Sequence, residues 1–182
     1  QLDRTLEMLK KLQVNEKIDD LEKELNALSK EQEELKDAIQ ENKISKEDAL
    51  KKQEEINNKF DDIKKDMKEM NDLNDALERP MDFDDFKEQQ ESISNELNNS
   101  KEKISSGKPS KAEQNQKSAA DQMKEMSEQL NKQQEDANKK QNEEDMGLIR
   151  MLLENLMSLS FDQELNLNGF SKVKDNDPNY RR

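Results

Sequence analysis

The stretch "NKISKEDALKKQEEI", residues 42–56, holds a short polar break that is followed at once by a new helix start. Ser45, with Asp48 three residues later, has the form of a capping box, which satisfies free backbone N–H groups at a helix N-terminus. On both sides of the break, apolar residues recur in alternating steps of four and three, as in helices that pack through heptad seams. The stretch therefore predicts the tip of an antiparallel helical hairpin near residues 42–45.

The first hairpin is expected to cover residues 1–79. In an antiparallel pair the numbers of facing residues have a constant sum, and the two seams satisfy this rule from Ile39 opposite Ala49 onward. The same alignment puts Gln32 opposite Ile56, so polar seam residues are expected to face apolar ones. The two seams comprise Val14, Ile18, Leu21, Leu25, Leu28, Gln32, Leu35 and Ile39, and then Ala49, Gln53, Ile56, Phe60, Ile63, Met67, Met70, Asn74 and Leu77.

A second, shorter hairpin is expected over residues 80–130, with its tip near residues 105–110. Gly107 suits the position just after a helix end, and Ser110 with Glu113 has the form of another capping box. The same constant-sum rule aligns the seams on either side of this tip. They comprise Phe86, Gln90, Ile93, Leu97, Ser100 and Ile104, and then Ala112, Gln116, Ala119, Met123, Met126 and Leu130.

The junction between the hairpins, "RPMDFDD" at residues 79–85, is rich in aspartate. The proline should end the preceding helix at Arg79, and Asp82 is expected to be the N-cap of the next. Neither this cluster nor "DNDPN" at residues 175–179 has the glycine and glutamate that a calcium loop requires. We therefore assign both clusters to capping and turns and expect no metal site.

Three segments follow the second hairpin. Residues 131–145 nearly lose the apolar seam and form either a polar helical bridge or a flexible linker. Residues 146–161 form an amphipathic helix that is too short to span a bilayer. Residues 162–182 are expected to be an extended polar tail.

The helix at residues 146–161 carries more apolar residues than a two-helix seam needs, so it should be buried on more than one side. Its methionines, like those of the seams, either fill a core or give an adaptable docking surface. We predict that this helix binds a protein partner. The candidate residues are Leu148, Ile149, Met151, Leu152, Leu153, Leu156, Met157, Leu159 and Phe161.

The composition explains why the fold should be thin. Only 29% of the residues are hydrophobic and 41% are charged, which excludes a thick core. A single seam gains too little from burial to outweigh the cost of ordering the backbone, so the hairpins should pack on one another, on a copy or on another protein. The predicted fold class is all-α, with elongated, consecutive antiparallel helical hairpins and coiled-coil-like packing.

The same composition limits the chemistry. The chain has no histidine and no cysteine, and it lacks a glycine-rich phosphate loop, so we expect no enzyme and no cofactor. The net charge of −13, with lysine and glutamate interleaved, argues against nucleic acid as a partner. The absence of cysteine fits both the cytoplasm and an extracytoplasmic compartment.

Several motifs resemble a family of very large, membrane-anchored, mostly helical proteins of Bacteroidota of unknown function. They are "RTLEMLK" at residues 4–10, "ERPMDFDD" at 78–85, "SAADQMKEMSEQL" at 118–130, "LLENLMSLSFDQE" at 152–164 and "DPNY" at 177–180. The resemblance implies that this chain is a piece from the middle of a longer one, with a membrane anchor upstream. It implies a place in the cell envelope, on the periplasmic side of the inner membrane, with the cytoplasm as the alternative.

The residues thus predict a non-enzymatic scaffold that docks a protein partner or a copy of itself, with any membrane contact made only by segments outside this sequence. A chaperone-like holdase, which clasps exported clients between its hairpins, is the alternative and predicts exposed hairpin interiors. A hydrolase or nucleotidase activity would need residues outside this sequence.

Overall fold

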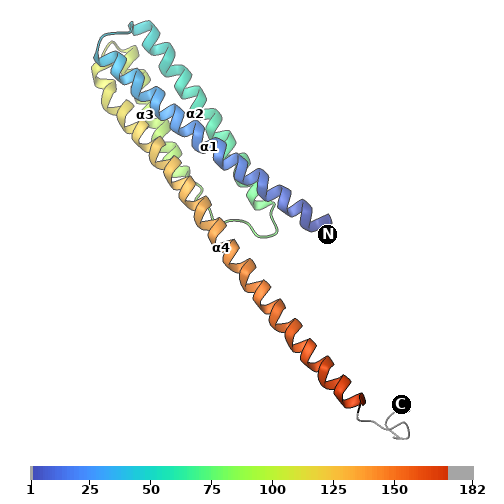
Figure 1. Cartoon of the computed structure of the whole chain (residues 1–182). Coiled ribbons are helices and arrows are strands. Elements are labelled where there is room, and N and C mark those ends of the chain that lie inside the picture. Colours follow the sequence, from blue (N-terminus) through green and yellow to red (C-terminus); the bar gives the residue numbers. More distant parts are fainter. Residues whose placement is uncertain (1, 172–182) are drawn as a thin grey trace. The chain divides into compact units, whose positions relative to one another are not determined.

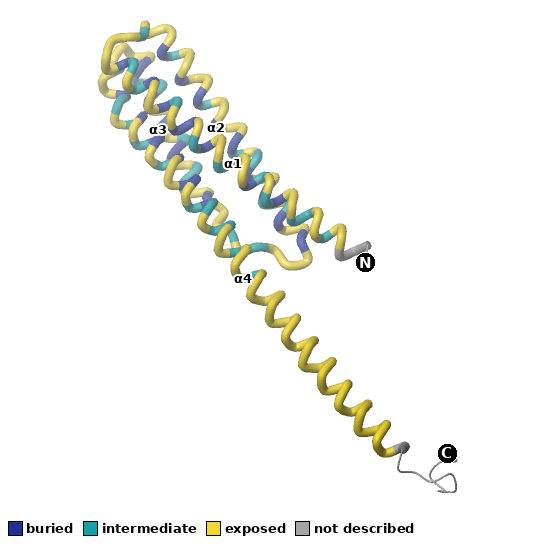
Figure 2. The backbone as a smooth tube through the Cα atoms, in the orientation of Figure 1, coloured by how far each residue is buried: buried dark blue, intermediate teal, exposed yellow. Residues whose placement is uncertain are grey.

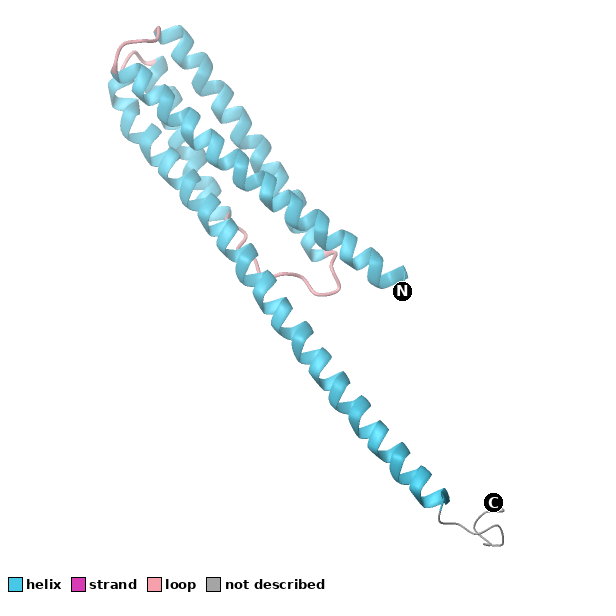
Figure 3. Cartoon of the chain, in the orientation of Figure 1, coloured by secondary structure: helices cyan, strands magenta, loops and turns pink. Residues whose placement is uncertain are grey.

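The structure is a computed structural model that describes residues 2–171, with side chains described for residues 5–169. It contains four helices, α1 (Leu2–Gln40), α2 (Lys46–Asp75), α3 (Lys87–Ser105) and α4 (Pro109–Ser171) (Figure 1). Residues 2–171 contain no strand (Figure 3). The chain divides into two units, Gln1–Ala137 and Asn138–Arg182, and α4 contributes to both. The all-α prediction is confirmed.

α1 and α2 form an antiparallel hairpin, joined by a short turn after Gln40 (Figure 1). At the start of α2, the Ser45 hydroxyl oxygen accepts the Asp48 backbone N–H at 3.1 Å and donates to the Asp48 carboxylate at 2.7 Å. The predicted cap is therefore present. Across the hairpin, Lys59 Nζ bonds the carboxylate of Glu31 at 2.7 Å, which ties the two helices together on the solvent side.

The seam residues form the core of the first unit. Every predicted seam position is buried except Gln90, which is half-buried (Figure 2). The apolar seam residues of both hairpins belong to one continuous cluster. The hairpins therefore pack on each other as a four-helix bundle, which supplies the second packed layer that a lone hairpin lacks.

α1 and α4 meet through small side chains that the sequence analysis did not single out. Ser29, Ala120 and Ser127 are all buried. The Ser29 hydroxyl donates to the Ala120 carbonyl at 2.8 Å, and the Ser127 hydroxyl accepts from the Asn26 side-chain amide at 2.7 Å. Small residues allow the two helices to approach closely. In the sequence, the signal for this contact between α1 and α4 was the presence of serine and alanine next to seam residues.

A polar layer crosses the bundle core and receives one residue from each helix. The side-chain carbonyl oxygen of Gln53 accepts from Ser100 at 2.8 Å, from Gln116 at 3.1 Å and from Gln32 at 3.2 Å. Gln53 also donates to the Gln32 side-chain oxygen at 2.7 Å. All four side chains are fully buried, so Gln53 joins the two hairpins at one level.

This layer corrects the expectation that Gln32 faces Ile56 and that polar seam residues never meet. An amide packed against isoleucine would leave buried donors and acceptors unpaired, at about 1–3 kcal/mol each. Gln32 lies three residues from Leu35, the predicted partner of Gln53. That is about 4.5 Å along the helix axis, a step that two glutamine side chains cover.

The junction between the hairpins also differs from the expectation. α2 ends at Asp75 and not at Arg79, and α3 begins at Lys87 after an N-cap at Phe86, not at Asp82. Phe86 has a left-handed backbone, with φ of 52°, and makes no side-chain cap. Its burial at 5% exposure explains this conformation, since core packing outweighs the local capping preference of an aspartate.

Asn74 fixes the path of the junction. Its side-chain amide donates to the Met81 carbonyl at 2.8 Å and its side-chain oxygen accepts the Met81 N–H at 2.9 Å. Through these two bonds the Asn74 side chain pairs with both backbone groups of Met81, as a neighbouring backbone segment would. Asn74 is a buried member of the predicted seam, and the sequence pattern did not indicate this capping role.

α4 differs from the expectation at both ends. It begins at Pro109, so Ser110 lies inside the first turn and is not its N-cap. Proline suits the first helical position because its fixed φ is helical and no N–H is needed there. At the other end α4 continues to Ser171, so residues 162–171 are helical and not extended. Residues 131–145 are also helical, and the rest of the predicted tail lies outside the described residues.

Gly107 has a φ of 74° at the predicted hairpin tip, and we expect Gly107→Ala to lower the free energy of unfolding by about 1 kcal/mol. The reason is backbone strain, because an added Cβ would approach only the Lys46 Nζ, at 3.9 Å. Urea titration followed by circular dichroism measures the change. Gly147→Ala is the matched control, since Gly147 is helical with open space around it. Equal stability of the two variants would contradict the assignment.

Candidate interaction surface

The second unit carries the predicted partner-binding residues on α4. All nine are exposed, from 44% at Leu148 to 61% at Leu156. Every residue from 142 to 169 is exposed (Figure 2). Leucine, methionine, glutamate and glutamine favour the helix locally, yet the apolar side chains of this segment have no packing partner among the described residues.

Some of the apolar side chains form a stripe along this helix, whereas Met151, Met157 and Phe161 fall on its other sides. Ile149, Leu152, Leu156 and Leu159 follow steps of three and four, which places them along one stripe. Leu148 and Leu153 are next to the stripe and widen it. The charged residues Arg150, Glu154 and Glu164 fall at other positions around the helix. We call residues 146–161 with this pattern the apolar face.

The exposed apolar surface is large for a soluble helix. Twelve half-exposed apolar side chains between Met146 and Leu167 present roughly 700 Å², at about 60 Å² each. The largest apolar patch of a typical monomer is about 300–600 Å² and is often functional. Summed over all sides of the helix, the exposed apolar area of this segment is therefore above the largest patch of a typical monomer.

Some exposed apolar residues lie outside the predicted set. Leu165 and Leu167 are 69% exposed and extend α4 beyond Phe161. In the first unit, four residues near the start of α1 are also exposed. They are Leu6, Met8, Leu9 and Leu12. These four residues precede Val14, where the predicted heptad seam begins, so the seam did not include them. Their spacing of three and four residues was the sequence signal for an apolar stripe.

The acidic junction is held by polar contacts. Lys87 bonds the Asp85 carboxylate at 2.8 Å and lowers the pKa of that carboxyl. Asp84 donates its backbone N–H to the Gln133 side-chain oxygen at 3.1 Å and accepts from the Gln133 amide at 2.6 Å. Within residues 2–171, no three acidic side chains converge as a metal site. The cluster at residues 175–179 lies outside the described residues.

Some charged pairs of the bundle join two helices. Lys17 Nζ bonds Asp66 at 2.8 Å and Glu69 at 2.9 Å, and these bonds raise the pKa of the lysine. Partial burial, followed by the negative charge of Asp66, raises the pKa of Glu24. Lys17 thus cross-links α1 to α2.

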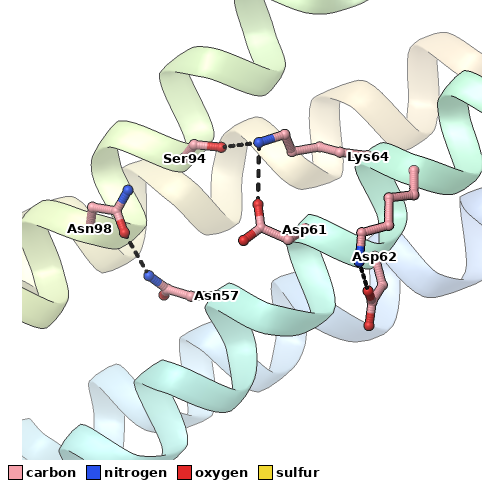
Figure 4. Close-up of polar contacts among 7 residues, drawn as sticks. Asn57, Asp61, Asp62, Lys64, Ser94 and Asn98 are labelled. Atoms are coloured by element: carbon pink, nitrogen blue, oxygen red, sulfur yellow. Dashed lines mark hydrogen bonds and ion pairs between the residues drawn. The ribbon is translucent and has the colours of Figure 1, made fainter.

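A small hollow between α2 and α3 is bordered by polar contacts (Figure 4). The Asn57 amide donates to the Asn98 side-chain oxygen at 3.0 Å, and Lys64 donates to the Ser94 hydroxyl at 3.3 Å. The space is about 30 Å³, comparable with one water molecule. It is too small for a metabolite, and its polar contacts serve to hold the helices together.

No family model matches the chain, and no curated protein or solved structure is significantly similar to it. Among the described residues, no helix has a long enough apolar stretch to cross a membrane.

Proposed function

We propose that this chain is a non-enzymatic scaffold that docks a protein through the apolar face of α4. One observation carries the proposal. The seams of the bundle are buried, whereas Leu148, Leu152, Leu156 and the other residues of the apolar face are exposed on a regular helix. Burying each such side chain fully would gain about 1.5–3 kcal/mol, so an apolar partner would bind it favourably.

A protein fits this surface better than other classes of ligand. The net charge of −13 opposes a phosphate backbone, and a helix without a cavity does not enclose a small molecule. An apolar stripe with helical spacing suits packing against another helix. On the sequence resemblance, we further propose that the whole protein is anchored in the envelope of a bacterium of the Bacteroidota and that this part lies on the periplasmic side.

The holdase alternative has less support. Clasping clients between hairpins requires apolar hairpin interiors that are open to solvent. In the first unit these residues are buried, and Phe60 and Leu97, for example, are each 1% exposed. Among the residues whose side chains the structure describes, large exposed leucines lie on α4 from residue 148 onward and near the start of α1, which is a narrow surface for unfolded chains.

Affinity capture of the tagged full-length protein after crosslinking in its native cells tests the proposal. We expect a stoichiometric protein, either foreign or a second copy, to be recovered with the unaltered chain and lost with Leu152→Asp/Leu156→Asp. The control Arg150→Gln/Ser158→Asp changes the net charge equally on the other side of the helix and should retain the partner. Equal recovery with both variants would show that the apolar face is not the docking site.

A further inference from the structure

We propose that the occupant of the apolar face is a second copy of the chain, which pairs its own residues 146–161 with those of the first. This inference rests on the proposed function and names its partner. It depends on three features of the exposed helix, which are its length, its charge pattern and its width.

The apolar stripe is short and closed by polar residues at both ends. The seam position that precedes Ile149 by four residues is Asp145, and the seam position that follows Leu159 by four residues is Gln163. The apolar part is therefore about 15 Å long. A longer apolar helix would meet Asp145 or Gln163, whereas a copy of the same helix has the same apolar length and the same polar limits.

The stripe is also complementary to itself. In an antiparallel pair centred between Leu152 and Leu156, Ile149 would pack on Leu159 of the second copy and Leu152 on Leu156. In a parallel pair each of these residues would meet its own counterpart. Neither arrangement places a charge in the seam, because Arg150 and Glu154 occupy outer positions. Between residues 149 and 159 no like charges oppose each other in either arrangement. At the end of the stripe, the parallel pair would bring Asp145 opposite its own counterpart, whereas the antiparallel pair would bring it opposite Gln163, so the antiparallel pair is favoured.

The flanking residues add to the contact in both directions. In a parallel pair Leu148 would lie beside Leu153 of the second copy, and in an antiparallel pair Leu153 would lie beside its own counterpart. At about 60 Å² each, the six apolar side chains that each copy contributes would bury roughly 700 Å² in total. That is below the area of most specific interfaces, so we expect weak association, with a Kd on the order of 100 µM.

Sedimentation equilibrium of the full chain, from about 10 µM to about 1 mM, tests this inference. The expected result is a mass that rises with concentration to that of two or more chains. Leu152→Asp/Leu156→Asp should sediment as a single chain throughout, and Arg150→Gln/Ser158→Asp should associate like the unaltered chain. Circular dichroism of each variant verifies that the bundle remains folded.

Two outcomes would overturn the inference. One is a single chain at every concentration, and the other is association that persists in Leu152→Asp/Leu156→Asp. The proposed function fails separately. If the chain stays single in solution but captures a foreign protein that this double variant loses, docking through the apolar face stands and only the identity of the occupant is wrong.

Discussion

Gln53→Leu should lower the free energy of unfolding by about 3–5 kcal/mol, although it replaces a polar core residue with an apolar one. Gln53 accepts hydrogen bonds from three buried side chains, Gln32, Ser100 and Gln116. Each would lose a partner, at about 1–3 kcal/mol, and the leucine would offset only part of this loss. Urea titration of the bundle, followed by circular dichroism, gives the change.

The control replaces the whole layer. A variant with Leu at positions 32, 53 and 116 and Ala at position 100 leaves no buried polar side chain in the layer. Replacing all partners by apolar groups of similar volume is often neutral or stabilising. We therefore expect this variant to be at least as stable as the unaltered chain. A single Gln53→Leu variant of unchanged stability would mean that the four side chains do not form the network described.

Phe60→Ala is expected to lower the free energy of unfolding by about 3–5 kcal/mol. Phe60 lies at the centre of α2, is 1% exposed and is among the largest fully buried side chains of the core. Removing its ring leaves a cavity that both hairpins border, since the core cluster is shared between them. Urea titration measures the loss.

The neighbouring residue provides the control for this prediction. Lys59→Ala removes an exposed side chain that pairs with Glu31 at 2.7 Å. Exposed ion pairs contribute about 0–1 kcal/mol, so this variant should be close to the unaltered chain. A Phe60→Ala variant as stable as Lys59→Ala would contradict the burial of the α2 seam in a shared core.

The seams were visible in the sequence because heptad spacing and burial have the same cause. A residue such as Ile18 or Ile93 recurs at the spacing that keeps one side of a helix facing its neighbours. The tips were visible for an equally local reason, since Ser45 caps a helix and Gly107 adopts a positive φ. These signals depend only on residues close together in the chain.

The missed features depend on packing between hairpins. The constant-sum alignment treats each hairpin alone, so it could not bring Gln116 to Gln53. It pairs residues at one level only, so it could not show that Gln32 reaches Gln53 along the helix axis. It also could not predict that burial of Phe86 would outweigh capping by Asp82. Once two hairpins are known to share a core, buried glutamines are expected to find one another, because an unpaired amide is costly.

The candidate surface was predicted from an excess of apolar residues. Residues 146–161 carry more leucine and methionine than a two-helix seam uses, and the structure leaves them exposed. The sequence did not indicate that residues 162–171 extend the same helix, because Leu165 and Leu167 are separated by polar residues.

The most direct test of the central claim is photocrosslinking in native cells. A photoreactive phenylalanine analogue at position 156 of the full-length protein lies on the apolar face, and one at position 158 lies on the other side of the same helix. We predict a crosslinked protein, foreign or a second copy, from position 156 and little from position 158. No product from position 156, or equal products from both positions, would contradict docking through the apolar face.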